Sequence, residues 1–127
     1  MHTKRMYFRK VPLTTEGLHG SGADFLELFK PYINNEQTII TSPHKIYGSE
    51  NNDLILQLRK NGIDHVRLAG MSANLCVESH MRELVEQGCR VTVVTDATAG
   101  KKLNGLGGYD AAITNFQMIA NDSLSTE

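Results

Sequence analysis

The sequence predicts a three-layer α/β/α domain built on a parallel sheet. Short β-branched runs at 37–41, 65–69 and 90–95 alternate with segments whose apolar residues recur at helical spacing. Such alternation implies parallel strands with right-handed crossovers and helices on both faces. The length of 127 residues suits one domain with one core. In sheets of this kind, the functional site lies beyond the carboxyl ends of the strands.

The chain begins with a glycine-containing stretch over 1–22, which we interpret as loop. A short helix should follow over 24–30 and end at Pro31, because proline cannot continue the helical hydrogen-bond ladder. Next comes the predicted strand at 37–41. The remaining elements are, in order, a helix that Ser49 can cap and Gly62 can end, a strand over 65–69, a turn over 71–74, a helix over about 75–87, a strand over 90–95, a glycine-rich loop over 100–108 and a helix over about 109–120.

The composition of the chain argues against a nucleic-acid-binding protein and against a membrane protein. The formal net charge is -1, from 13 basic and 14 acidic residues, whereas nucleic-acid proteins usually carry a basic excess. No apolar run reaches the roughly 18 residues of a membrane helix, and the N-terminus lacks the apolar middle of a signal peptide. We therefore expect a cytoplasmic protein that binds neither nucleic acid nor membrane, and whose two cysteines stay free thiols.

Cys76 is the candidate nucleophile. It follows a strand and a small-residue turn, and it lies in the first turn of the next predicted helix. Free backbone amides and the helix dipole at such a position stabilise a thiolate, and the same amides can hold an oxyanion. Lys45, on the exit loop of the preceding strand, is a candidate cation beside it. The alternative is that Cys76 is a small buried core residue.

Three segments resemble one enzyme family. Residues 68–77 read LAGMSANLCV, residues 87–97 read QGCRVTVVTDA, and residues 43–49 read PHKIYGS. Together they resemble the isochorismatase-like cysteine hydrolases, relatives of nicotinamidases and N-carbamoylsarcosine amidohydrolases. The resemblance runs from about residue 37 to residue 120. It implies an isochorismatase-like, Rossmann-like fold.

The resemblance also implies a site. The family uses an aspartate, a lysine and a cysteine, and Lys45 and Cys76 match the last two. A cis peptide would join Met71 to Ser72, and the amides of Ser72 and Cys76 would form the oxyanion hole. The implied reaction is cleavage of a small amide or carbamoyl C–N bond through a thioester, with no cofactor. The family commonly forms homo-oligomers.

The family's aspartate has no counterpart before Lys45, and Asp24 does not fit its pattern. We therefore expect one domain over 1–127 that lacks its N-terminal strands and is cut short at its C-terminus. The missing first strand would leave an open sheet edge, which favours oligomerisation or rearrangement. The alternative is a non-catalytic paralogue, or a fragment with a structural or binding role.

The other candidate residues each allow two interpretations. His80 lies one helical turn after Cys76 and either pairs with it at the site or belongs to a polar helix face or subunit contact. Asn74 caps the helix or contacts substrate, and Tyr47 contacts substrate or packs. Cys89 is interpreted as a packing residue. The histidines share no spacing with the cysteines that would indicate a metal site.

Overall fold

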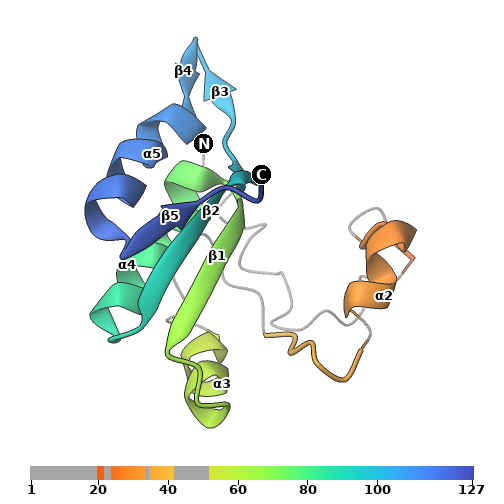
Figure 1. The fold of residues 1–127 in the computed structure, drawn as a ribbon. Coiled ribbons are helices and arrows are strands. Elements are labelled where there is room, and N and C mark those ends of the chain that lie inside the picture. Colours follow the sequence, from red (N-terminus) through yellow and green to blue (C-terminus); the bar gives the residue numbers. More distant parts are fainter. Residues whose placement is uncertain (1–19, 22–23, 34, 42–51) are drawn as a thin grey trace, which may run out of the picture.

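The computed structural model describes residues 20–21, 24–33, 35–41 and 52–127. Its centre is a parallel sheet of three strands, β1 (His65–Met71), β2 (Arg90–Ala99) and β5 (Asp122–Leu124), in the order β1-β2-β5 (Figure 1). Helix α4 (Glu78–Glu86) connects β1 to β2, and α5 (Gly108–Ile119) leads from β2 towards β5. The predicted α/β class with a parallel sheet is confirmed. Among the described residues, β1 has a neighbouring strand on one side only.

The core lies where α4 and α5 pack on β2 and on each other. In α4, apolar residues that recur at helical spacing in the sequence are buried, with Met81 and Leu84 at 0% and 1% exposure. From α5, Phe116 is fully buried against them. The cluster comprises Ala73, Val77, Met81, Leu84, Val91, Val93, Ala112 and Phe116.

Strand β2 is four residues longer than predicted. A register shift between Leu68 and Gly70 lets Gly70 pair with Thr98, so the ladder continues past residue 95. Gly70 has a φ of 115°, a conformation that disfavours residues with a Cβ. The irregularity lies at the end of β1 and therefore directly precedes the turn that carries Cys76.

Helix α3 (Leu54–Lys60) ends as the sequence predicted. Gly62 adopts a left-handed φ of 63°. The N–H of Ile63 bonds to the carbonyl of Leu58 at 2.9 Å, and that of Gly62 bonds to the carbonyl of Arg59 at 3.1 Å. This pair of bonds is the Schellman arrangement that closes helices at a glycine. It fixes the connection from α3 into β1.

The predicted strand at 37–41 is wrong. Residue 37 belongs to a turn, and residues 38–41 have no regular secondary structure and pair with no described strand. The side chain of Asn35 accepts a hydrogen bond from Gln37 N at 2.9 Å, and Thr38 Oγ1 donates to the Tyr32 carbonyl at 2.8 Å. A local asparagine turn therefore organises this segment, and Ile39 and Ile40 stay about half exposed.

Proline does not end the first helix. A 3-10 turn, η1 (Glu27–Phe29), leads into α2 (Lys30–Ile33), and Pro31 is the second residue of α2. The first turn of a helix leaves its N–H groups unbonded, so a proline costs nothing there. The large apolar side chains of this segment are not buried either, since Phe25, Leu28 and Phe29 are all exposed.

The glycine-rich loop at 100–108 is a hairpin. Strands β3 (Lys102–Leu103) and β4 (Leu106–Gly107) pair antiparallel around Asn104 and Gly105, whose φ values are 51° and 80°. Two consecutive left-handed residues suit the tight turn that Asn-Gly favours. The hairpin projects beyond the carboxyl end of β2, above α5 (Figure 1).

Strand β5 follows α5 and is short. Thr95 Oγ1 donates to the Leu124 carbonyl at 3.0 Å. Asp96 accepts hydrogen bonds from Ser125 and Thr126, and these bonds, chiefly those from Thr126, lower the pKa of its carboxyl. Among the helices in the described ranges, none is long and apolar enough to cross a membrane.

Candidate active site

The turn that carries Cys76 connects β1 to α4. The peptide bond between Met71 and Ser72 is cis, at the position that the resemblance implied. Residues Ala73–Val77 then form a π-helical turn, η2, ahead of α4. The carbonyl of Ser72 accepts hydrogen bonds from Leu75 N at 3.0 Å and from Val77 N at 3.2 Å. The second bond spans five residues, so the backbone around Cys76 is wider than in an α-helix, a feature that recurs at functional sites.

Cys76 is half-buried and lines a cavity of about 240 Å³ beside the carboxyl half of β1. It is therefore not enclosed in the core, although Ala73 and Val77 on either side of it are. The described residues that line the cavity are Leu54, Leu68, Ala69, Met71, Cys76, Val77 and His80. Cavities of this kind, lined mainly by apolar side chains, are typical of small-molecule sites.

His80 lies beside Cys76 and is 8% exposed. Its Nδ1 is 2.7 Å from the carbonyl oxygen of Cys76. His80 is therefore buried in the cavity wall and does not lie on a solvent-exposed helix face, whereas its role as a subunit contact stays a prediction. The spacing of four residues predicted that the two side chains share a face. It did not predict the burial.

Asn74 does not act as the cap of this helix. The N-cap position is Ser72, and no side chain makes a capping bond there. The Asn74 side chain instead lies against the start of α5, where a Cβ built on Gly108 would come 2.5 Å from Asn74 Oδ1. Gly108 N also donates to the Lys101 carbonyl at 3.0 Å. The glycine therefore permits a close approach between η2, the hairpin and α5.

Glu78 is a structural residue of the site that the sequence did not reveal. Its carboxylate accepts a hydrogen bond from Asn115 Nδ2 on α5 at 3.0 Å and an ion pair from Arg82 at 2.8 Å. The Glu78 side chain is 16% exposed. Asn115 thus joins α5 to the first turn of α4.

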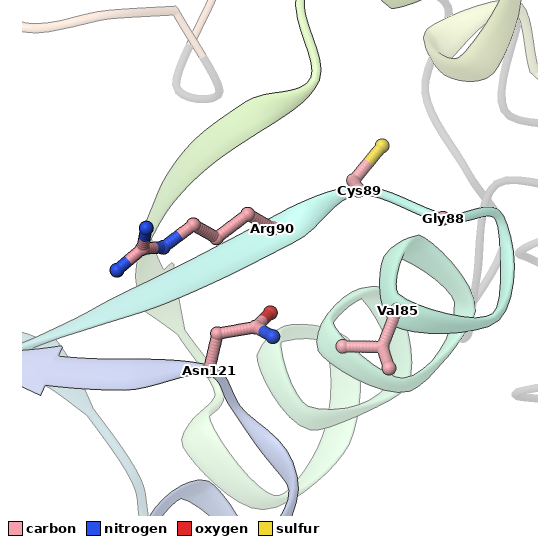
Figure 2. Close-up of a pocket in the computed structure, with 5 residues that line it drawn as sticks. All are labelled: Val85, Gly88, Cys89, Arg90 and Asn121. Atoms are coloured by element: carbon pink, nitrogen blue, oxygen red, sulfur yellow. The ribbon is translucent and has the colours of Figure 1, made fainter.

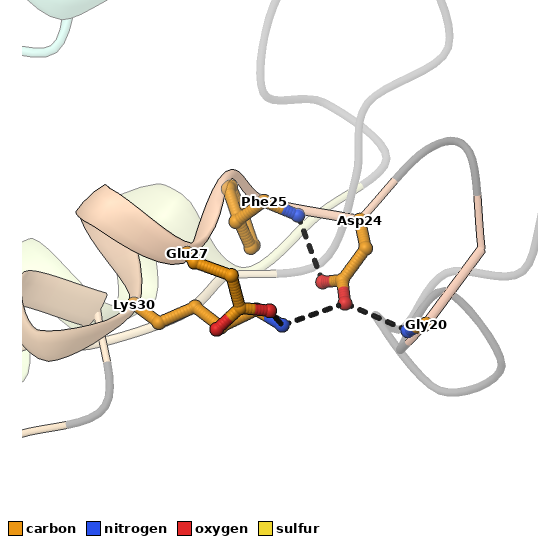
Figure 3. A network of polar contacts seen from close by, with 5 residues as sticks. All are labelled: Gly20, Asp24, Phe25, Glu27 and Lys30. Carbon is orange, nitrogen blue, oxygen red and sulfur yellow. Dashed lines mark hydrogen bonds and ion pairs between the residues drawn. The ribbon is translucent and has the colours of Figure 1, made fainter.

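Lys45 and Tyr47 lie outside the described residues. Asp24 did not fit the pattern of the family's aspartate. Its carboxylate accepts hydrogen bonds from the N–H groups of Gly20 and Phe25 and forms an ion pair with Lys30 at 3.1 Å (Figure 3). The Gly20 bond first, and then Lys30, lower the pKa of Asp24 to about 2.

Cys89 occupies the opposite end of β2 from the cavity. It packs partly against the core, as predicted, and it lines a surface hollow of about 490 Å³ with Val85, Gly88, Arg90 and Asn121. Its sulfur and the Arg90 guanidinium extend in different directions (Figure 2). Within the described ranges, no group of three or more histidine, cysteine or acidic side chains is placed to hold a metal ion.

Comparison with known proteins decides the family. The family model described as the isochorismatase domain matches residues 1–127. The chain belongs to the isochorismatase family. Its curated relative YwoC of Bacillus subtilis, an uncharacterised isochorismatase family protein, is 39% identical over 82 residues, which cover 61% of this chain and 43% of YwoC.

Solved structures place the isochorismatase-family chain among similar folds. An isochorismatase-like hydrolase from Alkaliphilus metalliredigens matches with a TM-score of 0.67 and 25% identity, over 80% of this chain and 54% of that one. The nicotinamidase PncA of Bacillus subtilis matches with a TM-score of 0.66 and 18% identity, over 77% and 52%. The chain thus spans about half the length of these relatives.

Proposed function

We propose that Cys76 is the nucleophile of a hydrolase that cleaves the C–N bond of a small amide or carbamoyl compound. The observation that carries the proposal is the position of Cys76: half-buried in a cavity wall, in a widened turn at the carboxyl end of β1. Parallel α/β sheets hold their sites at this end.

The chemistry follows from that position. The Cys76 thiolate attacks the carbonyl carbon and forms a C–S bond, and the negative charge moves to the carbonyl oxygen. The amide groups of Ser72 and Cys76 stabilise this oxyanion. The C–N bond then breaks, and the leaving nitrogen takes up the proton that the thiol gave up. Water hydrolyses the thioester to a carboxylic acid and restores the thiol.

Lys45 is the second proposed catalytic residue, through the stabilisation that an ammonium group gives to a thiolate. Its role rests on the family motif, as does that of Tyr47 as a substrate contact. The proposed substrate class draws on the nicotinamidase PncA of Bacillus subtilis among the similar structures. We further propose that the enzyme needs no cofactor and acts as a cytoplasmic homo-oligomer.

A second candidate function is a non-catalytic role. It is favoured by one observation: the carboxylate of Asp24 is held by the Gly20 N–H and by Lys30. A protein of this kind would bind small molecules or a partner chain without turnover. The two candidates differ in whether bond cleavage depends on Cys76.

Release of ammonia from nicotinamide and from an N-carbamoyl amino acid separates these candidates. The hydrolase proposal predicts turnover of at least one of them, and a loss of at least about a hundredfold in Cys76→Ala, because the covalent route disappears. Cys89→Ala is the matched control and should keep the wild-type rate. Equal rates in wild type and Cys76→Ala would contradict the nucleophile, and the absence of turnover would favour the non-catalytic role.

A further inference from the structure

We propose that Leu54 limits the size of the apolar group that a molecule bound beside Cys76 carries. This inference rests on the proposed function, since in the hydrolase that group is the acyl part of the substrate. It makes Leu54 a specificity-determining residue and restricts the substrates to amides with a small apolar acyl group. The residue belongs to helix α3, outside the turn that carries the nucleophile.

The described wall of the cavity comes from two parts of the chain. All its residues except Leu54 belong to the continuous segment β1–η2–α4, between Leu68 and His80. Leu54 is the first residue of α3. Among the described residues, it therefore supplies the part of the wall that is independent of the nucleophile's own turn.

Helical spacing directs the Leu54 side chain inward. Leu54 and Leu58 lie four residues apart and share one face of α3. Leu58 and Ile55 pack against the core cluster, whereas Leu54, one turn nearer to the start of the helix, is partly buried and lines the cavity. Leu56 lies on another face, with 58% of its surface exposed. The same helix thus carries a leucine in the wall and a matched leucine outside it.

Hydrogen bonds hold α3 at both ends. Leu54 N donates to Asn52 Oδ1 at 3.0 Å, and Gln57 Nε2 donates to Asp53 Oδ2 at 2.9 Å. At the other end, the backbone bonds around Gly62 close the helix. A side chain on an anchored helix is held in place more firmly than one on a loop. The length of the leucine side chain therefore sets the limit on this side of the cavity.

The volume and the lining of the cavity indicate which group fits. Its volume of about 240 Å³ is below the roughly 300 Å³ at which pockets for drug-sized ligands begin. An apolar cavity of about 150 Å³ holds a benzene molecule, so one ring fits here and two do not. The side chains of Leu54, Leu68, Ala69, Met71 and Val77 are apolar. A charged group placed against them would lose its hydration without compensation.

Competition between methyl and benzyl methanethiosulfonate tests the proposal without the true substrate. Both reagents transfer an alkylthio group to a thiolate, and they differ only in the size of the apolar group that arrives. The protein receives a limiting amount of an equal mixture, and mass spectrometry gives the ratio of benzyl to methyl product at Cys76. Division by the same ratio at Cys89, at the other end of β2, removes the intrinsic difference between the reagents.

Two variants change the wall in opposite directions. Leu54→Ala should raise the corrected benzyl-to-methyl ratio about tenfold, the lower end of the selectivity that one methylene group gives in an apolar pocket. Leu54→Phe should lower the ratio, and Leu56→Ala is the matched control that should keep the wild-type value. A loosened fold would instead move both Leu54 variants towards the ratio at Cys89. No shift, or shifts of both Leu54 variants in the same direction, would overturn the proposal.

The ratio and the release of ammonia report on separate claims. Turnover that depends on Cys76, together with a ratio that does not respond to Leu54, would leave the hydrolase intact and overturn the role of Leu54. A ratio that follows Leu54 in a protein without turnover would support Leu54 as the size limit of the cavity and reject the hydrolase.

Discussion

Asn115 Nδ2 lies 3.0 Å from Glu78 Oε1, and this contact joins the middle of α5 to the first turn of α4, two residues after Cys76. Glu78 is mostly shielded from solvent, and its other partner, Arg82, is about half exposed. The two partners of one carboxylate therefore differ in environment. The bond from Asn115 should therefore contribute more to the free energy of unfolding than the ion pair with Arg82.

Asn115→Ala should lower the free energy of unfolding by about 1 kcal/mol, because the partly buried carboxylate loses a hydrogen bond. Arg82→Ala is the matched control, and an exposed ion pair of this spacing contributes about 0.3–0.5 kcal/mol. Urea denaturation measures both. A larger loss in Arg82→Ala than in Asn115→Ala would contradict this assignment.

Gly108→Ala should destabilise the fold, because the new methyl group would come 2.5 Å from Asn74 Oδ1 and 3.0 Å from the Lys101 carbonyl. Overpacking of this kind costs about 1–3 kcal/mol. The double variant with Asn74→Ala should recover part of the loss in thermal stability, since one of the two contacts disappears. If the double variant is no more stable than Gly108→Ala, the contact with the Lys101 carbonyl alone causes the loss of stability.

Asp24 should titrate with a pKa of about 2, below its ordinary value of 3.8. A carboxyl whose pKa is lower in the folded state stabilises that state above pH 3.8, and this contribution is lost as the pH falls through about 2. Lys30→Met should raise the pKa towards 3.8, and NMR titration of the carboxyl carbon measures both proteins. An unchanged pKa in the variant would assign the whole effect to the backbone bonds.

The chain should self-associate, because β1 has a neighbour on one side only among the described residues. Sedimentation velocity should show a species larger than the 14.1 kDa monomer. Met71→Lys, at the end of β1 where Met71 is 73% exposed, should weaken the association. Met118→Lys on α5, where the methionine is 77% exposed, is the matched control. A monomer at all concentrations would refute the prediction.

Local signals predicted much of the fold. Gly62 predicted the end of α3, because such an end depends on the left-handed conformation of that one residue. The stripe containing Met81 and Leu84 predicted the buried face of α4 because helical periodicity is a local property. The Asn104-Gly105 pair also carried a local signal for the hairpin, but the surrounding glycines led to its interpretation as a loop.

Other features depend on contacts that a sequence does not state. The β-branched run at 37–41 can form a strand only beside another strand. The hydrogen bonds around Asn35 hold the start of this segment in a turn instead. The position of Cys76 was predicted from its place after a strand and turn. The burial of His80 and the bond between Glu78 and Asn115 depend on how α4 packs, and no periodicity reveals them.

The most direct test of the account is the rate at which iodoacetamide alkylates the two cysteines of the same molecule, measured by peptide mass spectrometry. A thiol activated at the carboxyl end of β1 predicts that Cys76 reacts at least about tenfold faster than Cys89, which packs at the other end of the sheet. Equal rates, or faster labelling of Cys89, would contradict the claim that Cys76 is the nucleophile.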